Sequence, residues 1–439
     1  MKTIINTLKA IILIAGIIAL SCIKGWGANP VQPQRAGAVG FSIGSKGYIG
    51  MGYGYTYQNQ TCKKDFWEYN PATDSWTQKA DFGGGLRANA AFFALNNKGY
   101  VGTGQSSTQL FKDFWEYNPA TNKWTRKADF GGVTRKCATG FAISSGNINK
   151  GYIGTGLLPN GTTPINLQDL WEYDPAANSW SQKTDFPGTP RYAAVSFSTG
   201  GKGYLGTGIN FVSTTEMTWY QDFYEYDPIS NLWTRKSDFP GTERAFAAGF
   251  SIGSMGYIGT GSSHRTYYSD FWEYNPAENS WIQINDFASA RDASVGFSIG
   301  TKGYIGTGGN GIDAASYLAD FWEYDQNTNA WTRKTDLGSK HKGPLKDGII
   351  NDENEPASNS ELIVYPNPSS TTFNFNLKTS GKELVSIQIY DLLGRLVSEY
   401  KSLPPGNIMT IGEDLYAGIY IAVVTQGEYR KSVKINKVK

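Results

Sequence analysis

A phrase resembling DFWEYN and an arginine each recur six times along the chain, and together they could supply ion pairs or a charged binding site. In every copy a tryptophan follows the opening aspartate of the phrase by 11 residues. The arginines are Arg35, Arg87, Arg135, Arg191, Arg244 and Arg291. A guanidinium can hold a carboxylate or a sulfate through two parallel hydrogen bonds. The arginines could therefore pair with neighbouring carboxylates, or they could bind an anionic ligand.

The repeated carboxylates are poor candidates for acid–base catalysis. Two catalytic carboxylates need unlike environments, whereas these occupy the same position in each copy. His264 and His341 are the only histidines, and no group of cysteines and histidines has the spacing of a zinc site. We therefore expect no metal and no cofactor, and we interpret the phrase as structural.

The composition favours an all-β chain with no nucleic-acid partner. Lys and Arg (40) nearly balance Asp and Glu (38), so the basic excess that nucleic-acid binding needs is missing. Glycine is abundant at 52 residues and aromatic residues reach 14%, which is typical of many short strands joined by tight turns.

The N-terminus has the pattern of a secretory signal peptide, which we place at residues 1–27. Lys2 and Lys9 precede and flank an apolar run, residues 10–20, that is too short for a comfortable membrane span. A rival interpretation is lipid attachment at Cys22. We expect no transmembrane span in the mature chain, and no disulfide between Cys62 and Cys137, which lie in different repeats.

Each repeat of about 50 residues contains four predicted strands. An arginine precedes a small and apolar strand, a stretch such as KGYIGMG supplies the second strand, DFWEYN the third, and SWTQKADF the fourth. Four strands at this period are the signature of kelch repeats. The chain resembles the kelch family over residues 35–337, although Gly-Thr-Gly or Gly-Met-Gly replaces the usual glycine doublet. The resemblance implies a six-bladed β-propeller at residues 28–337.

A polar segment, residues 338–361, reads as a linker to a second domain at residues 362–439. This domain resembles the C-terminal sorting domain of the type IX secretion system. The motifs that carry the resemblance comprise Tyr365, Pro366, Asn367, Pro368, Tyr390, Asp391, Gly394, Arg395, Gly418 and Tyr420. The resemblance implies a small Ig-like β-sandwich that engages the type IX machinery. It also implies export through the periplasm of a Gram-negative cell to the outer surface or the medium.

Loop lengths indicate which face of the propeller binds a ligand. From the glycine of each Gly-Tyr pair to the next phrase aspartate the separations are 18, 14, 18, 19, 14 and 17 residues, whereas the separation from each tryptophan to the next arginine is 11 in four cases and 10 in the fifth. These loops lie on the same face as the six arginines and carry aromatic residues. The candidate contacts, besides the arginines, are Tyr55, Tyr57, Trp219, Tyr220, Tyr267 and Tyr268.

Aromatic rings beside amides and hydroxyls suit a carbohydrate, and protein interfaces use the same side chains. We therefore expect a binding module for a glycan or a protein ligand. The alternative is a sugar-modifying enzyme on the kelch scaffold, such as an isomerase or epimerase of the sialic-acid type.

Overall fold

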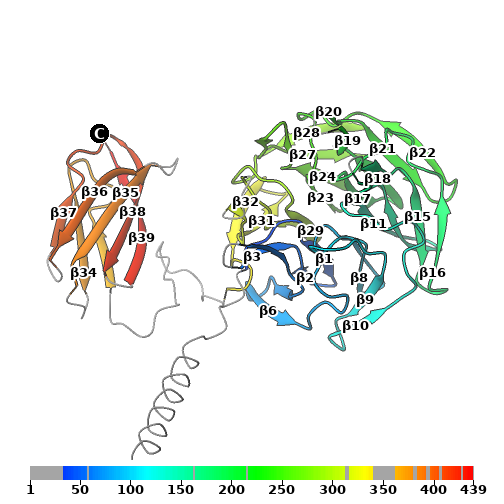
Figure 1. Ribbon diagram of the computed structural model, residues 1–439. Coiled ribbons are helices and arrows are strands. Elements are labelled where there is room, and N and C mark those ends of the chain that lie inside the picture. The colour runs from blue at the N-terminus through cyan, green and yellow to red at the C-terminus, as the bar shows by residue number, and fades with distance from the viewer. Residues whose placement is uncertain are drawn as a thin grey trace, which may run out of the picture. The chain divides into compact units, whose positions relative to one another are not determined.

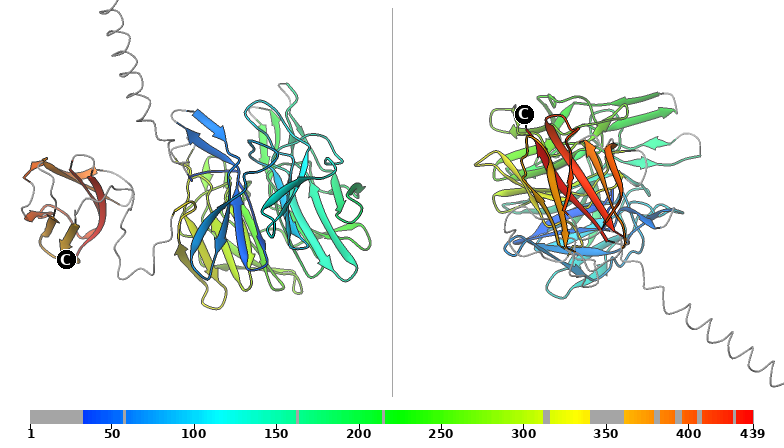
Figure 2. Two further views of the ribbon diagram at one scale, coloured as in Figure 1. Left: turned by 90° about the horizontal axis from the view of Figure 1, so that it is seen from below. Right: turned by 90° about the vertical axis from the view of Figure 1, so that its left-hand side faces the viewer.

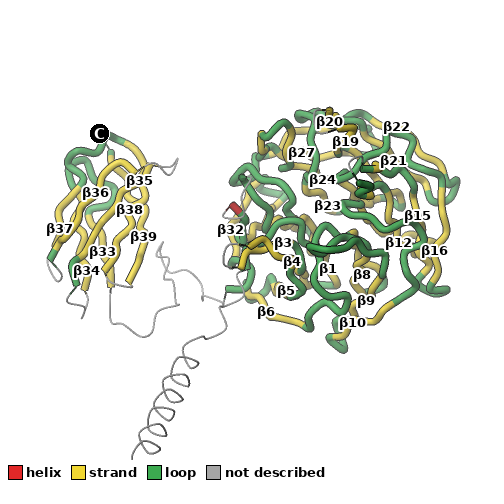
Figure 3. Tube along the Cα trace, in the orientation of Figure 1, coloured by secondary structure: helices red, strands yellow, loops and turns green. Residues whose placement is uncertain are grey.

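The computed structural model describes residues 33–56, 59–161, 164–213, 216–311, 316–339, 361–378, 383–391, 396–404, 408–426 and 429–438. The chain divides into two compact units, Met1–His341 and Lys342–Lys439. The predicted signal peptide, including Cys22, and nearly all of the predicted linker lie outside the described residues. Strands and loops make up almost the whole of the described trace (Figure 3).

The described part of the first unit contains six four-stranded antiparallel sheets arranged around a common axis (Figure 1). We call these sheets blades 1 to 6, and in each the strands follow one another in sequence. Blades 1 to 3 comprise β1 (Val39–Ile43), β2 (Lys46–Gly50), β5 (Phe66–Asn70) and β6 (Ser75–Lys79); β7 (Ala91–Leu95), β8 (Lys98–Gly102), β9 (Phe114–Asn118) and β10 (Lys123–Arg126); and β11 (Thr139–Ser145), β12 (Ile148–Gly154), β15 (Leu170–Asp174) and β16 (Ser179–Lys183).

Blades 4 to 6 repeat this arrangement. They comprise β17 (Val195–Thr199), β18 (Lys202–Gly206), β21 (Phe223–Asp227) and β22 (Leu232–Lys236); β23 (Ala248–Ile252), β24 (Met255–Gly259), β27 (Phe271–Asn275) and β28 (Ser280–Ile284); and β29 (Val295–Ile299), β30 (Lys302–Gly306), β31 (Phe321–Asp325) and β32 (Ala330–Lys334). The prediction of an all-β propeller with six blades is confirmed.

Short hairpins form within the variable loop between the second and third strands of several blades. Within the described ranges they are β3 (Tyr53–Thr56) with β4 (Asn59–Cys62), β13 (Leu157–Leu158) with β14 (Ile165–Asn166), β19 (Ile209–Ser213) with β20 (Glu216–Trp219), and β25 (Ser262–Ser263) with β26 (Thr266–Tyr267). The β3–β4 hairpin extends beyond the sheet of its own blade (Figure 2, blue). We call this side of the propeller the hairpin face.

The aromatic residues of the repeated phrase pack between neighbouring blades. Tyr69 faces blade 6, where its ring meets that of Phe321 edge to face, while Phe66 faces blade 2 and packs against Tyr117. Alternate side chains of a strand point to opposite faces, so bulky rings on both faces suit a sheet that is covered on both sides. The glycine before each tyrosine makes room for a neighbour: a Cβ at Gly151 would lie 2.0 Å from the ring of Phe93 in blade 2.

The last blade closes onto the first through backbone and side-chain hydrogen bonds. The Trp76 indole of blade 1 donates to the carbonyl of Thr335 at 2.8 Å, as each fourth-strand tryptophan does to the blade before it. Trp76 is buried and the other five are half-buried. These bonds join the outer strands around the circle, so the propeller has no open end.

The second unit is a small β-sandwich with its own core. One sheet has the order β33 (Glu361–Tyr365), β34 (Phe373–Lys378) and β37 (Ile408–Ile411); the other has the order β36 (Leu396–Leu403), β35 (Val385–Asp391), β38 (Gly418–Gln426) and β39 (Tyr429–Lys437). Phe373, Phe375, Ile387 and Val424 are fully buried between the sheets. A separate core predicts that each unit folds without the other.

Candidate ligand-binding site

The six repeated arginines form bidentate ion pairs inside the propeller. Each lies in the connection that enters a blade and reaches the aspartate before the third strand of the same blade. In blade 3 the Arg135 guanidinium donates to the two carboxylate oxygens of Asp169 at 2.6 and 2.7 Å. All six arginines are essentially inaccessible to solvent. Arg135 holds the pKa of the Asp169 carboxyl below its ordinary value, although burial acts in the opposite direction.

The Gly-Thr-Gly or Gly-Met-Gly stretch explains why these pairs repeat. Its middle residue has a positive φ and turns its carbonyl toward the arginine, so that Arg135 Nη1 donates to the Thr155 carbonyl at 2.9 Å. The N–H of the following glycine, Gly156, bonds the backbone carbonyl of Arg191 in the next blade at 2.8 Å. A Cβ at Gly156, where φ is +109°, would crowd Ala138 at 3.1 Å. The departure from the usual glycine doublet therefore builds both the ion pair and a link between blades.

The arginines consequently do not line an open positive mouth. Their guanidiniums are already bound to carboxylates and carbonyls, and aromatic rings cover several of them, as Tyr220 covers Arg191 at 4.1 Å and Tyr268 covers Arg244 at 4.3 Å. Of the two roles that the sequence left open, the structure places the arginines in the carboxylate-pairing one. Contact with a ligand would require breaking a buried ion pair.

The structure places the predicted aromatic contacts in different surroundings. The rings of Tyr220 and Tyr268 lie over the guanidiniums of Arg191 and Arg244, as described above. Trp219, at the end of β20, packs its ring against the exposed His264 of the neighbouring blade, with centroids 4.1 Å apart. Tyr267 is half-buried, and burial raises its pKa. The backbone of Tyr55 lies on β3, and Tyr57 lies outside the described residues.

One residue from each blade forms a closed ring of backbone hydrogen bonds on the hairpin face. Each donates its N–H to the carbonyl of its counterpart in the preceding blade at 2.9–3.0 Å, and each has a positive φ. We call this set the mouth ring; its members are Gly37, Asn89, Cys137, Ala193, Phe246 and Ala293. Each lies two residues after a repeated arginine, so the buried ion pairs hold the ring in place.

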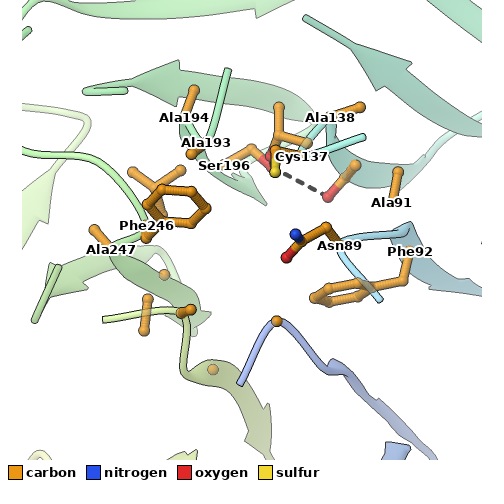
Figure 4. Close-up of a pocket in the computed structure, with 18 of the residues that line it drawn as sticks. Asn89, Ala91, Phe92, Cys137, Ala138, Ala193, Ala194, Ser196, Phe246 and Ala247 are labelled. Carbon is orange, nitrogen blue, oxygen red and sulfur yellow. Dashed lines mark hydrogen bonds between the residues drawn. The ribbon is translucent and has the colours of Figure 1, made fainter. Parts of the chain in front are cut away.

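A cavity of about 140 Å³ lies inside the mouth ring (Figure 4). Most of its lining is alanine, glycine and backbone from the starts of the six inner strands. The Asn89 side chain points into it, Phe246 and Phe92 supply rings, and Thr139 and Ser196 share a hydroxyl hydrogen bond of 2.5 Å (dashed in Figure 4). Burial raises the pKa of the Cys137 thiol to about 12, so this thiol is a neutral part of the wall.

Sequence reasoning missed this cavity, although a signal for it was present. The mouth-ring position carries glycine, asparagine, cysteine, alanine, phenylalanine and alanine in blades 1 to 6, whereas the arginine two residues earlier never changes. Variation at one position of an otherwise regular repeat marks a place that the scaffold does not constrain.

Two further ionisable groups on loops of the hairpin face have shifted pKa values, and neither lines the cavity. Lys63 is buried at the position that an aromatic ring occupies in three other blades, and burial together with the charge of Arg35 lowers its pKa to about 8. Asp292 precedes the mouth-ring residue of blade 6, and its carboxylate accepts a hydrogen bond from the Ser262 hydroxyl at 2.6 Å. Burial raises the pKa of Asp292.

The raised pKa of Asp292 predicts a pH-dependent stability. The folded protein keeps this proton at a pH where the unfolded chain has lost it, so stability is highest below the unfolded pKa and falls as pH rises through the folded pKa. Asp292→Asn, whose amide oxygen can still accept from Ser262, should therefore raise the melting temperature at pH 7. The gain should disappear near pH 4. Equal gains at both pH values would show that ionisation of Asp292 is not the cause.

The sorting motif occupies strand ends of the second unit. Tyr365 ends β33 and is 41% exposed, and Pro366, Asn367 and Pro368 follow it at the surface. Tyr390 and Asp391 end β35, whereas Gly394 and Arg395 lie outside the described residues. Gly418 opens β38, and the buried Tyr420 donates its hydroxyl to the Tyr416 carbonyl at 2.9 Å. The motif thus combines exposed turn residues with a side chain that packs into the core.

Three further findings concern metal ligands, cysteines and helices in the described residues. In these ranges no three histidine, cysteine, aspartate or glutamate side chains are grouped so as to hold a metal ion. Cys62 and Cys137 are both free thiols. No helix in the part of the chain that is described has the length and apolar character to cross a membrane.

Comparison with known proteins gives separate results for the two units. Residues 363–438 match the family model of the secretion system C-terminal sorting domain. The chain is also 42% identical, over 64 residues, to an N-acetylneuraminate epimerase of Yersinia enterocolitica; this stretch is 14% of the chain and 16% of that relative's length. Among solved structures, that of YjhT matches with a TM-score of 0.56 and 16% identity, covering 69% of this chain and 98% of the other.

At that identity the similarity to YjhT shows the fold alone. The sorting-domain match indicates export by type IX secretion. The chain thus joins a six-bladed β-propeller to a domain that matches the secretion system C-terminal sorting domain family.

Proposed function

We propose that this protein is a secreted or cell-surface binding protein whose propeller holds a glycan or protein ligand on the hairpin face. The observation that carries the proposal is the cavity inside the mouth ring, where a nearly symmetric scaffold places unlike side chains around one opening. Binding sites are concave, mostly apolar and equipped with a few polar groups, and this cavity fits that description. The sorting domain accounts for delivery outside the cell.

Side chains on the hairpin face extend the site beyond the cavity. Trp219 packs on the apolar cluster formed by Ala193, Ile209 and Ala245, next to Phe246 of the mouth ring. Glu243 and the exposed His264 lie beside it, 3.6 Å apart. An aromatic ring next to polar groups offers a surface for the apolar face of a sugar or for a protein side chain.

Binding of the purified mature chain to a glycan array, together with pull-down of surface proteins, tests the proposal. Once a ligand is found, Trp219→Ala should weaken its binding by about 1–3 kcal/mol, the range for loss of a good aromatic contact. Ile229→Ala is the matched control, because Ile229 is 83% exposed in a turn at the opposite end of the same blade. Unchanged affinity in Trp219→Ala and lost affinity in Ile229→Ala would place the ligand on the other face.

A second candidate is a sugar-acid isomerase or epimerase, which the similarity to the N-acetylneuraminate epimerase favours. Such an enzyme needs a base and an acid near the reacting carbon. None of the described residues that line the cavity is a carboxylate, a histidine, a lysine or an arginine. NMR of N-acetylneuraminate anomers during incubation with the protein separates the two functions: turnover supports the enzyme, and saturable binding without turnover supports the binding protein.

A further inference from the structure

We propose that the mouth-ring cavity seats one uncharged sugar ring and discriminates against acidic sugars. This inference rests on the proposed binding function and specifies the ligand class that the site takes. It is carried by the size of the cavity, by the hydrogen-bonding groups that remain available in its wall, and by the absence of a matching charge among its described lining residues.

The volume suits one six-membered ring. A protein cavity of about 150 Å³ holds a benzene molecule, and this one measures about 140 Å³ and opens to the hairpin face. Phe92 lines both this cavity and a second one deeper along the propeller axis, and the equivalent residues of the other blades are glycine or serine. The bulk of the Phe92 ring narrows the passage between the two cavities. A terminal sugar can therefore enter the first cavity while the rest of a glycan extends outward.

The backbone of the mouth ring does not bind the ligand with its N–H groups. Each of these N–H groups is already bonded to the carbonyl of the preceding blade. Hydrogen bonding therefore falls to side chains. The Asn89 amide, which projects into the cavity (Figure 4), can donate and accept. The Ser196 hydroxyl donates to the Gly140 carbonyl at 3.1 Å and shares a 2.5 Å bond with Thr139, so these two hydroxyls offer acceptor oxygens that suit the alcohol groups of a sugar.

The part of the cavity wall formed by Phe246 is apolar. Phe246 lies in contact distance of Tyr192, with ring centroids 6.2 Å apart, and both pack against the cluster that contains Trp219. The apolar face of a pyranose can lie on the Phe246 ring, which lines the cavity, while its alcohols face Asn89. A ligand with this pair of surfaces is a carbohydrate rather than a purely apolar molecule.

The charges around the cavity do not favour an anion. Cys137, with a raised pKa, is the one titratable side chain in the described lining. The six arginines are held by their own aspartates, and Lys136 and Asp292, which flank ring residues in blades 3 and 6, are of opposite sign. A carboxylate that enters the cavity loses hydration without gaining a cation, which is strongly unfavourable.

Saturation-transfer NMR on the full mature chain tests this with matched pairs: glucose and glucuronate, galactose and galacturonate, mannose and mannuronate. At least one neutral sugar should bind, and its acidic partner at least about tenfold more weakly. Two variants borrow residues that other blades carry at the same position, so they suit the local backbone: Asn89→Gly as in blade 1, and Phe246→Ala as in blades 4 and 6. Both should weaken neutral-sugar binding at least about fivefold, whereas Ile229→Ala should not.

Each alternative outcome overturns the inference in a distinguishable way. If acidic sugars bind as tightly as neutral ones, the charge argument is wrong and the proposed binding function stands. If sugar binding survives Asn89→Gly and Phe246→Ala but is lost in Trp219→Ala, the ligand sits on the hairpins instead of in the cavity. If none of the sugars binds while a surface protein does, the ligand is a protein. If neither glycans nor proteins bind, the proposed function fails as well.

Discussion

Arg244→Met should lower the free energy of unfolding of the propeller by about 3–5 kcal/mol, the usual loss when one partner of a buried ion pair is removed. Arg244 is inaccessible to solvent and donates to both carboxylate oxygens of Asp270, at 2.6 and 2.9 Å. It also satisfies the carbonyls of Thr242 and Thr260. Methionine keeps much of the side-chain volume and leaves these acceptors without their donor.

Urea unfolding followed by tryptophan fluorescence measures this loss in the full chain, because residues 342–439 contain no tryptophan. Arg235→Met is the matched control: Arg235 lies on β22, the last strand of the preceding blade, and pairs with Asp238 at 2.9 Å, but its side chain is 60% exposed. Exposed pairs contribute little, so the control should change stability only slightly. Adding Asp270→Asn to Arg244→Met should restore part of the loss. Equal, small effects in Arg244→Met and Arg235→Met would contradict a stabilising role for the buried pairs.

Deleting residues 362–439 should abolish delivery to the cell surface or the medium and leave the propeller folded in the periplasm. The deleted part contains the segment that matches the sorting-domain family, and its core is separate from those of the blades. Because nearly all the tryptophans lie in the propeller, its fluorescence and melting temperature should match those of the full chain.

Cell fractionation of a Gram-negative host that carries the type IX machinery measures the distribution of both proteins. Fusion of residues 338–439 to an unrelated periplasmic protein is the complementary control and should transfer export to that protein. Normal surface delivery of the truncated chain would refute the sorting role. Loss of the propeller's folded signal would instead show that the two units depend on each other for stability.

The sequence by itself determined the architecture, because the same pattern of strand and turn residues occurs six times. The four predicted strands of each blade follow from alternating apolar residues and from the turn residues between them, as in DFWEYNPATDSW. A constant spacing of 11 residues from aspartate to tryptophan left no room for a different connection. The sorting motifs likewise identified the second unit, since Tyr365, Tyr390 and Tyr420 all lie on its strands.

The candidate site could not be obtained in this way. The sequence left both ion pairing and anion binding open for the arginines, since the choice depends on whether a carboxylate lies within hydrogen-bond distance. Arg135 and Asp169 are 34 residues apart in sequence, and the blade brings them to 2.6 Å. In the same way, the sequence predicted Tyr220 and Tyr268 as ligand contacts. In the structure their rings cover the guanidiniums of two arginines.

The mouth-ring cavity depends on tertiary structure most of all. Asn89, Cys137 and Phe246 belong to three different blades and meet only because the circle closes, with the Gly37 N–H bonded to the Ala293 carbonyl across the first and last blades. A local pattern fixes which face of a strand is buried, because that depends on residues two apart. The number of blades and the closure of the circle decide which side chains converge on the axis. Both depend on packing between residues that lie far apart in the sequence.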